Sequence, residues 1–270
     1  MKIIYVAFNT FKEAVRDKIL YTLVFFAVVI IISSTLLSSL TIGEQTRIIK
    51  DLGLASMSLF GLVITLFMGI NLVYKEVDKR TIYPIIAKPV RRSSFLLGKY
   101  FGLLSTLIVE IGIMSFVLVV VISLFETLNL ELWKAIYLIF IELAFVTAVV
   151  LLFSSFSTPI LSGFFTLGIY IIGHLSKLFH MLGEKSESDI LKYSVKALYY
   201  IMPNLEKFNI KSQVTHNIIV SHEYIMSTSL TGRLIIEATV DGRHTTVSRI
   251  AELVQRAQAS KADIQRLADR

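Results

Sequence analysis

The chain has 270 residues, of which 54% are hydrophobic and 17% are charged, and its mean hydropathy is +0.70. A typical soluble domain is about 25% charged, and here charge is nearly absent from several runs of roughly 20 residues. Such runs predict an all-α membrane protein rather than a soluble protein with a large helical core. The net charge of +7 lies mostly beside these runs, so membrane topology explains it better than nucleic-acid binding, which we do not expect.

Several kinds of chemistry are excluded by residue type or by motif. The chain has no cysteine, which removes disulfides, thiolate metal sites and thiol catalysis. Its five histidines form no HxxxH-like pair, so we expect no metal site. The patterns GxxxxGK[ST], GxSxG and HExxH do not occur, so we expect neither ATP binding through a phosphate loop nor enzymatic activity in this chain.

The N-terminal segment 1–18 predicts an amphipathic helix at the membrane interface. Its apolar residues follow a stripe of about 3.6 residues, and charged residues occupy the other side. The stripe consists of Ile3, Val6, Ala7, Phe11, Ala14 and Val15. Such a helix before a span tends to lie in the headgroup plane, and its basic residues favour the cytoplasmic side. The alternative is a cytoplasmic extension of the first span.

Five membrane spans are predicted, with a short polar segment at 41–53 between the first two. They cover approximately residues 19–40, 54–73, 101–125, 132–153 and 160–178. Trp133 and Tyr137 begin the fourth span, where aromatic residues favour the interface. Gly61 and Gly69 share a face of the second span and could let another helix approach closely. With a cytoplasmic N-terminus, five spans place the polar segment 181–229 outside.

A basic loop at residues 74–100 joins the second and third spans. It carries seven lysines and arginines against two acidic residues, a bias that keeps a short loop cytoplasmic. An apolar cluster lies inside the charge, and interfaces commonly combine an apolar centre with a charged border. The loop therefore predicts a docking surface for a partner, and the alternative is a topogenic loop that only touches anionic lipid. The predicted docking residues are Glu76, Asp78, Lys79, Arg80, Thr81, Ile82, Tyr83, Ile85, Ile86, Lys88 and Pro89.

Two acidic residues lie inside predicted spans, Glu110 in the third and Glu142 in the fourth. An ionisable group costs a few kcal/mol in hydrocarbon, so it usually faces protein or a water-filled cavity. The functional interpretation is an intramembrane polar site on a transport route or a site of proton uptake. The alternative is a carboxyl group hydrogen-bonded between helices, which we favour for Glu142 because serines and threonines lie nearby. His174 is expected to be an interfacial hydrogen-bonding group.

The first 229 residues resemble the permease subunit of type-2 ABC transporters, in the branch involved in multicopper enzyme maturation. The motifs that carry the resemblance are FNTFKEAVRDKILY and LVYKEVDKRTIYPIIAKPVRRSSFLLGKYFG. The resemblance implies that segment 1–18 is the elbow helix and that loop 75–99 docks on a separate ATP-binding subunit, to which ATP and magnesium belong. It also implies a homodimer or a pair with a second permease. Because that family has six spans, we expect the sixth to be missing here.

The C-terminal residues 230–270 differ in character. RLIIEATV alternates as a short strand does, and 247–269 predicts an amphipathic helix too charged to cross a bilayer, so we expect a short β/α soluble tail. EATVDGRHTTVSRIAELVQRAQASKADIQRLADR is similar to heavy-metal P-type ATPases, in the stretch after the actuator domain. The motifs DKTGT, TGE and CPC are absent, so no pump chemistry is expected.

Taken together, the two resemblances predict a permease subunit of an ATP-driven exporter in the plasma or inner membrane, in contact with membrane lipid. They also predict a fusion or chimeric gene with its junction near Leu230 and Thr231; the alternative is a natural soluble tail. There are two alternative functions. One is a membrane scaffold or assembly factor without transport, and the other is a fusion with a fragment of a metal-transporting ATPase.

Overall fold

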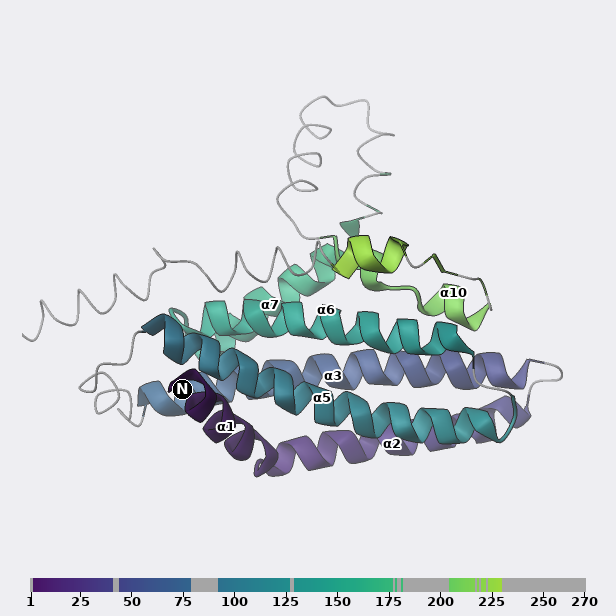
Figure 1. The fold of residues 1–270 in the computed structure, drawn as a ribbon, viewed down its shortest axis with the longest axis horizontal. Coiled ribbons are helices and arrows are strands. Elements are labelled where there is room, and N and C mark those ends of the chain that lie inside the picture. Colours follow the sequence, from purple (N-terminus) through teal and green to yellow (C-terminus); the bar gives the residue numbers. More distant parts are fainter. Residues whose placement is uncertain are drawn as a thin grey trace, which may run out of the picture.

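The computed structural model describes residues 2–40, 44–78, 92–126, 129–176, 178, 181, 204–216, 218, 220–221 and 223–229. Over these ranges the regular structure is helical and contains no strand, so the predicted all-α fold is confirmed (Figure 1). The named elements are α1 (Lys2–Val15), α2 (Lys18–Ser39), α3 (Gln45–Asp78), α5 (Arg92–Ser123), α6 (Leu130–Ser154), α7 (Pro159–His174), the 3-10 helix η1 (Leu205–Phe208) and α10 (Lys211–Thr215). The predicted strand and helix of the tail lie outside the described residues.

Four of these helices are long and apolar enough to cross a membrane, namely α2, α3, α5 and α6. They lie side by side along most of their length (Figure 1). Helix α6 is the most enclosed, with 72% of its apolar window buried, whereas α2 has 28% buried and lies at the periphery. The fourth predicted span is apolar on nearly all sides, and such a helix belongs at the centre of a bundle.

Helix α7 is shorter than the predicted fifth span, which was placed at 160–178. It has 16 residues, or about 24 Å, whereas a bilayer core is about 30 Å thick. The helix ends at His174, just after Gly173, which is a poor helix former. Beyond this end, Ser176 Oγ donates a hydrogen bond to Asn204 Oδ1 (2.9 Å). After a turn at Leu175, the described residues Ser176, Leu178 and Met181 are helical again, so the break in the helix is local to Leu175.

Helix α3 extends beyond the predicted second span at both ends. It has 34 residues and includes 45–53, which the sequence predicted to be a polar segment between spans. The polar first turns remain helical because their side chains find partners: Lys50 Nζ lies 2.9 Å from Glu126 Oε2, and Arg47 pairs with Glu44. At the other end α3 continues to Asp78, and α5 begins at Arg92, so part of the predicted basic loop is helical.

Small residues on α3 let α6 approach closely, as the sequence predicted. A Cβ atom added at Gly61 would collide with the side chain of Leu143, and one at Gly69 would collide with Val150. The second contact lies further toward the C-terminus than the first on both helices. Helices α3 and α6 are therefore parallel neighbours. They approach closely at the two glycines because a glycine has no side chain to separate them.

Helix α1 packs against the first turns of α5 through two glycines four residues apart. A Cβ at Gly98 would lie 2.6 Å from Val6 Cβ, and one at Gly102 would lie 2.6 Å from the carbonyl oxygen of Ala7. The predicted apolar stripe of α1 thus faces protein. Asp17 separates α1 from α2, since its Oδ1 accepts a hydrogen bond from the backbone N–H of Ile19 (3.1 Å) as an N-cap. The alternative of a continuous extension of the first span is therefore wrong.

A segment that we call the cap, comprising the described residues within 204–229, lies along one side of α6, over the half of the bundle farther from α1 (Figure 1). Its apolar side chains join the core formed by α3, α5 and α6; they are Leu205, Phe208, Ile210, Val214 and Val220. Helix α6 also holds the cap by polar contacts. Lys134 Nζ donates to the carbonyl oxygen of Val220 (2.8 Å), and Glu131 Oε2 accepts from the Val220 N–H (3.2 Å).

The outward faces of the bundle are apolar along α1, α2, α5 and α7. The exposed fraction of Phe25 is 61%, that of Phe116 is 70% and that of Ile160 is 85%. Soluble monomers rarely expose apolar patches on this scale. Trp133 and Tyr137, at the start of α6, are half-exposed, and their interfacial position stays a prediction.

Candidate functional site

The predicted docking loop is bracketed by α3 and α5. Glu76 and Asp78 belong to the end of α3, and the other predicted docking residues lie outside the described part of the chain: Lys79, Arg80, Thr81, Ile82, Tyr83, Ile85, Ile86, Lys88 and Pro89. The end of α3 and the start of α5 lie near α1 (Figure 1). The docking surface stays a prediction.

Lys99 is buried, although the sequence grouped it with the basic loop. Its exposed fraction is 1%, and its ammonium lies 5.5 Å from the centre of the Phe95 ring, within reach of a cation–π contact. It lies beside Gly98, where α1 crosses α5. Its charge therefore belongs to the α1–α5 junction rather than to a solvated loop.

The carboxylate of Glu142 is fully enclosed, with an exposed fraction of 0%. The sequence predicted serine or threonine partners, and this is wrong. Thr147, the nearest hydroxyl-bearing residue on α6, donates to its own helix at Leu143. The group at ion-pair distance is His174 of α7, whose Nε2 lies 3.3 Å from Glu142 Oε1. The expected interfacial histidine is thus the partner of the intramembrane acid.

Other polar groups converge on the same carboxylate. The phenol of Tyr170, one turn before His174, lies close to this carboxylate and to the hydroxyl of Ser58 on α3, although neither Glu142 oxygen has a hydrogen-bond partner among the described residues. Lys211 of α10 and Glu206 of η1 lie close enough to influence its charge. The site therefore combines α3, α6, α7 and the cap. Helix η1 packs against both α6 and α7, which brings the cap beside this site.

Glu110 lies at a similar depth but in different surroundings. Gly53 of α3 faces Leu118 of α5, and these two helices are antiparallel, so Glu110 is level with Gly61 and hence with the turn of α6 that carries Glu142. The exposed fraction of Glu110 is 1%, and among the described residues neither oxygen has a hydrogen-bond partner. Within the described part of the chain the two acids are not paired, and an imidazole lies beside Glu142 but not beside Glu110.

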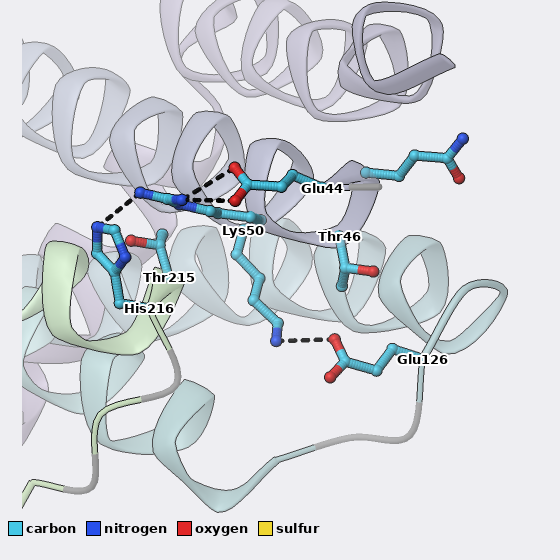
Figure 2. A pocket seen from close by; sticks show the side chains of 8 residues that line it. Glu44, Thr46, Lys50, Glu126, Thr215 and His216 are labelled. Atoms are coloured by element: carbon cyan, nitrogen blue, oxygen red, sulfur yellow. Dashed lines mark hydrogen bonds and ion pairs between the residues drawn. The ribbon is translucent and has the colours of Figure 1, made fainter. Parts of the chain in front are cut away.

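A polar pocket of about 370 Å³ opens at the cap end of the bundle (Figure 2). Its charged residues are already paired: Arg47 Nη1 lies 2.9 Å from Glu44 Oε2, and Lys50 Nζ lies 2.9 Å from Glu126 Oε2. Arg47 Nη2 also lies 2.7 Å from Nε2 of His216 in the cap. Because an arginine can only donate, the neutral Nε2 of this histidine accepts. The pocket therefore ties α3 to the end of α5 and to the cap.

Burial also acts on the cap's own charges. It lowers the pKa of Lys211, and the nearby carboxylates of Glu142, Asp51 and Glu206 oppose that effect. Burial likewise raises the pKa of Tyr224, whose hydroxyl donates to the carbonyl oxygen of Lys207 (2.8 Å). In the described ranges no three histidine or acidic side chains come together in a way that could hold a metal ion.

Sequence reasoning missed most residues around these sites. Tyr170 and Lys211 carried no signal of their own, because a tyrosine in an apolar run and a lysine in a polar segment are both common. Lys50 and Glu126 could have been suspected, since each flanks a long apolar run at the same predicted side of the membrane. Their pairing becomes visible only when α3 and α5 are placed side by side.

The four long apolar helices and their apolar outward faces define an all-α membrane protein. No family model matches the chain. A 39-residue part of it is 64% identical to a probable copper-transporting ATPase, PacS, of Synechococcus elongatus. The match covers 14% of this chain and 5% of that protein, so the chain spans a small fraction of the length of this relative. It agrees with the resemblance of the C-terminal segment to heavy-metal P-type ATPases.

Proposed function

We propose that this membrane protein is the permease subunit of an ATP-driven exporter in the plasma or inner membrane. A separate ATP-binding subunit, which holds the ATP and magnesium, docks on loop 75–99 from the cytoplasm. A second permease, either another copy or a related chain, completes the transport path. The resemblance of the two N-terminal motifs to type-2 ABC permeases supports this proposal, and so does the geometry of the helices that flank the loop.

The observation that carries the proposal is the continuity of α3 and α5. They have 34 and 32 residues and leave the loop at the same end of the bundle. At 1.5 Å per residue, each is roughly 50 Å long. At the far end, α3 contacts the cap through Arg47, and Lys50 joins it to Glu126 just after α5. A displacement of the loop by the ATPase would therefore move two rigid helices and reach the polar pocket directly.

The docking surface is tested by replacing Ile82 and Ile85 together with aspartate. We expect the double variant to lose the ATP-binding subunit that co-purifies with the wild-type chain, by at least about tenfold, because a charge buried in an apolar interface centre is strongly unfavourable. Quantitative mass spectrometry of the tagged, detergent-solubilised complex measures the loss.

The matched control places two aspartates at exposed apolar positions of the cap, Ile218→Asp with Met226→Asp, whose exposed fractions are 54% and 67%. It should retain the ATPase, since these residues belong to the cap and not to the loop. Retention of the ATPase by the loop variant, or its absence from the wild-type preparation, contradicts the proposal and favours a scaffold or assembly role.

The similarity to a copper-transporting ATPase favours a second element, a fused P-type ATPase fragment after residue 229. With a cytoplasmic N-terminus, the five predicted spans place the chain after the cap on the external side. We therefore expect a C-terminal tag to be cleaved by protease added outside right-side-out vesicles, and an N-terminal tag to be protected. Protection of the C-terminal tag would contradict this topology. Sequencing genomic DNA across the codons for Leu230 and Thr231 tests the fusion itself, which requires one continuous reading frame.

A further inference from the structure

The geometry of the contact between Glu142 and His174 requires a proton to be bound between the two side chains. Nδ1 of His174 lies 3.3 Å from the backbone carbonyl oxygen of Tyr170. A carbonyl oxygen only accepts, so Nδ1 carries a hydrogen and donates it. In the neutral imidazole this leaves Nε2 with a lone pair, and Nε2 faces Glu142 Oε1 at 3.3 Å. Without a further proton, two lone pairs would face each other in a buried gap.

Charge leads to the same requirement. A carboxylate next to a neutral imidazole has a net charge of −1, and Glu142 is 0% exposed, where an uncompensated charge is expensive. One proton makes the pair neutral overall, whether it is bonded to Oε1 or to Nε2. Both carboxylate oxygens are shielded from solvent, so the packing leaves no room beside them for a larger ligand.

The charged and polar groups that face the pair affect how tightly this proton is bound. From α7, the phenol of Tyr170 lies close to the carboxylate, and from α3 Ser58 lies close to Tyr170. From the cap, Lys211 brings a positive charge and Glu206 a negative one. Lys211 is the cation that competes with the proton, because either can neutralise the carboxylate.

Asp51 of α3 acts on the pair indirectly, since it interacts with Lys211. Helix α5, which also packs on α6, contributes Glu110 at a similar depth.

His174 is the member of the pair with an exposed edge. The side chain of Glu142 is 1% exposed, whereas that of His174 is 21% exposed at the end of α7. We propose that Glu142 and His174 form a proton-binding site that exchanges its proton with the aqueous phase at the cap end, through the exposed edge of His174. The site is independent of the docking loop and of the ATP-binding subunit, so it does not rest on the proposed transport function.

The test uses the full-length chain in lipid nanodiscs with ¹⁵N-labelled histidine. The ¹⁵N chemical shift of Nε2 reports the proton in the gap, and the His174→Gln variant assigns the signal among the five histidines. In Glu142→Gln we expect the midpoint of proton binding to fall by about one pH unit or more, a tenfold loss of proton affinity, because the anion is removed. In Lys211→Gln the midpoint should rise, because the competing cation is removed.

Two controls separate this role from a structural one. Glu110→Gln removes the other buried acid, and Lys207→Gln removes an exposed charge of the cap; both should leave the midpoint unchanged. If Glu142→Gln does not fold, Glu142→Asp supplies the comparison, since its shorter side chain withdraws from Nε2 and must also lower the midpoint. An unchanged midpoint in the Glu142 variants overturns the site.

The side of access is tested in vesicles with a uniformly oriented chain. Acidification of the cap side should change the His174 signal at once. A change that follows acidification of the loop side instead overturns the route through His174.

Discussion

Leucine at Gly102 is expected to detach α1 from α5. An added Cβ would lie 2.6 Å from the carbonyl oxygen of Ala7 and 2.6 Å from Thr10 Cβ, so the obstruction includes backbone that cannot rotate away. Overpacking a well-packed contact costs about 1–3 kcal/mol, and we expect the upper end of that range. Hydrogen–deuterium exchange of α1 in detergent micelles should rise markedly, and trypsin should cleave faster after Lys12 and Arg16.

The same helix offers a matched control. A Cβ added at Gly112 meets nothing within 4 Å, so Gly112→Leu has the same change in helix propensity, a gain of up to about 1 kcal/mol, without the collision. It should leave α1 as protected as in the wild type. If α1 remains equally protected in Gly102→Leu, the close approach of the two helices does not hold α1 in place.

Removal of the carboxylate of Glu126 is expected to destabilise the bundle through Lys50. The side chain of Lys50 is 4% exposed and that of Glu126 is 31% exposed. Loss of one partner from a buried pair costs about 3–5 kcal/mol, and partial exposure of Glu126 places Glu126→Ala nearer about 2–3 kcal/mol. The free energy of unfolding measured by SDS titration in mixed micelles tests this, and it should be recovered in part by adding Lys50→Met.

The neighbouring exposed pair provides the comparison. Arg47 and Glu44 have side-chain exposures of 39% and 60%, and an exposed pair contributes about 0–1 kcal/mol. Glu44→Ala should therefore change stability much less than Glu126→Ala, and its effect should weaken further at high salt. Equal effects of the two variants would show that burial of Lys50 does not govern the strength of this contact.

The positions of the glutamates show how far sequence reasoning reached. Both were predicted to lie inside apolar helices, and both are buried there. The partner of Glu142 was predicted to be a nearby hydroxyl, because sequence reasoning weighs neighbours along the chain. The structure places His174 beside it instead, 32 positions later in the sequence, since α7 runs back along α6 and ends at its level.

The apolar runs by themselves determined that this is an all-α membrane protein and located α2 and α6 to within two residues at each end. Those assignments depend on the free energy of transferring a continuous segment into lipid. That free energy is a sum over the residues of the segment itself, so it can be read from the sequence. Tertiary structure alone decided that the polar turns 45–53 are helical, that the stripe of α1 faces α5, and that the cap closes over Glu142. Each of these depends on a partner distant in sequence, because a buried polar group or a glycine contact is stable only when its complement is in place.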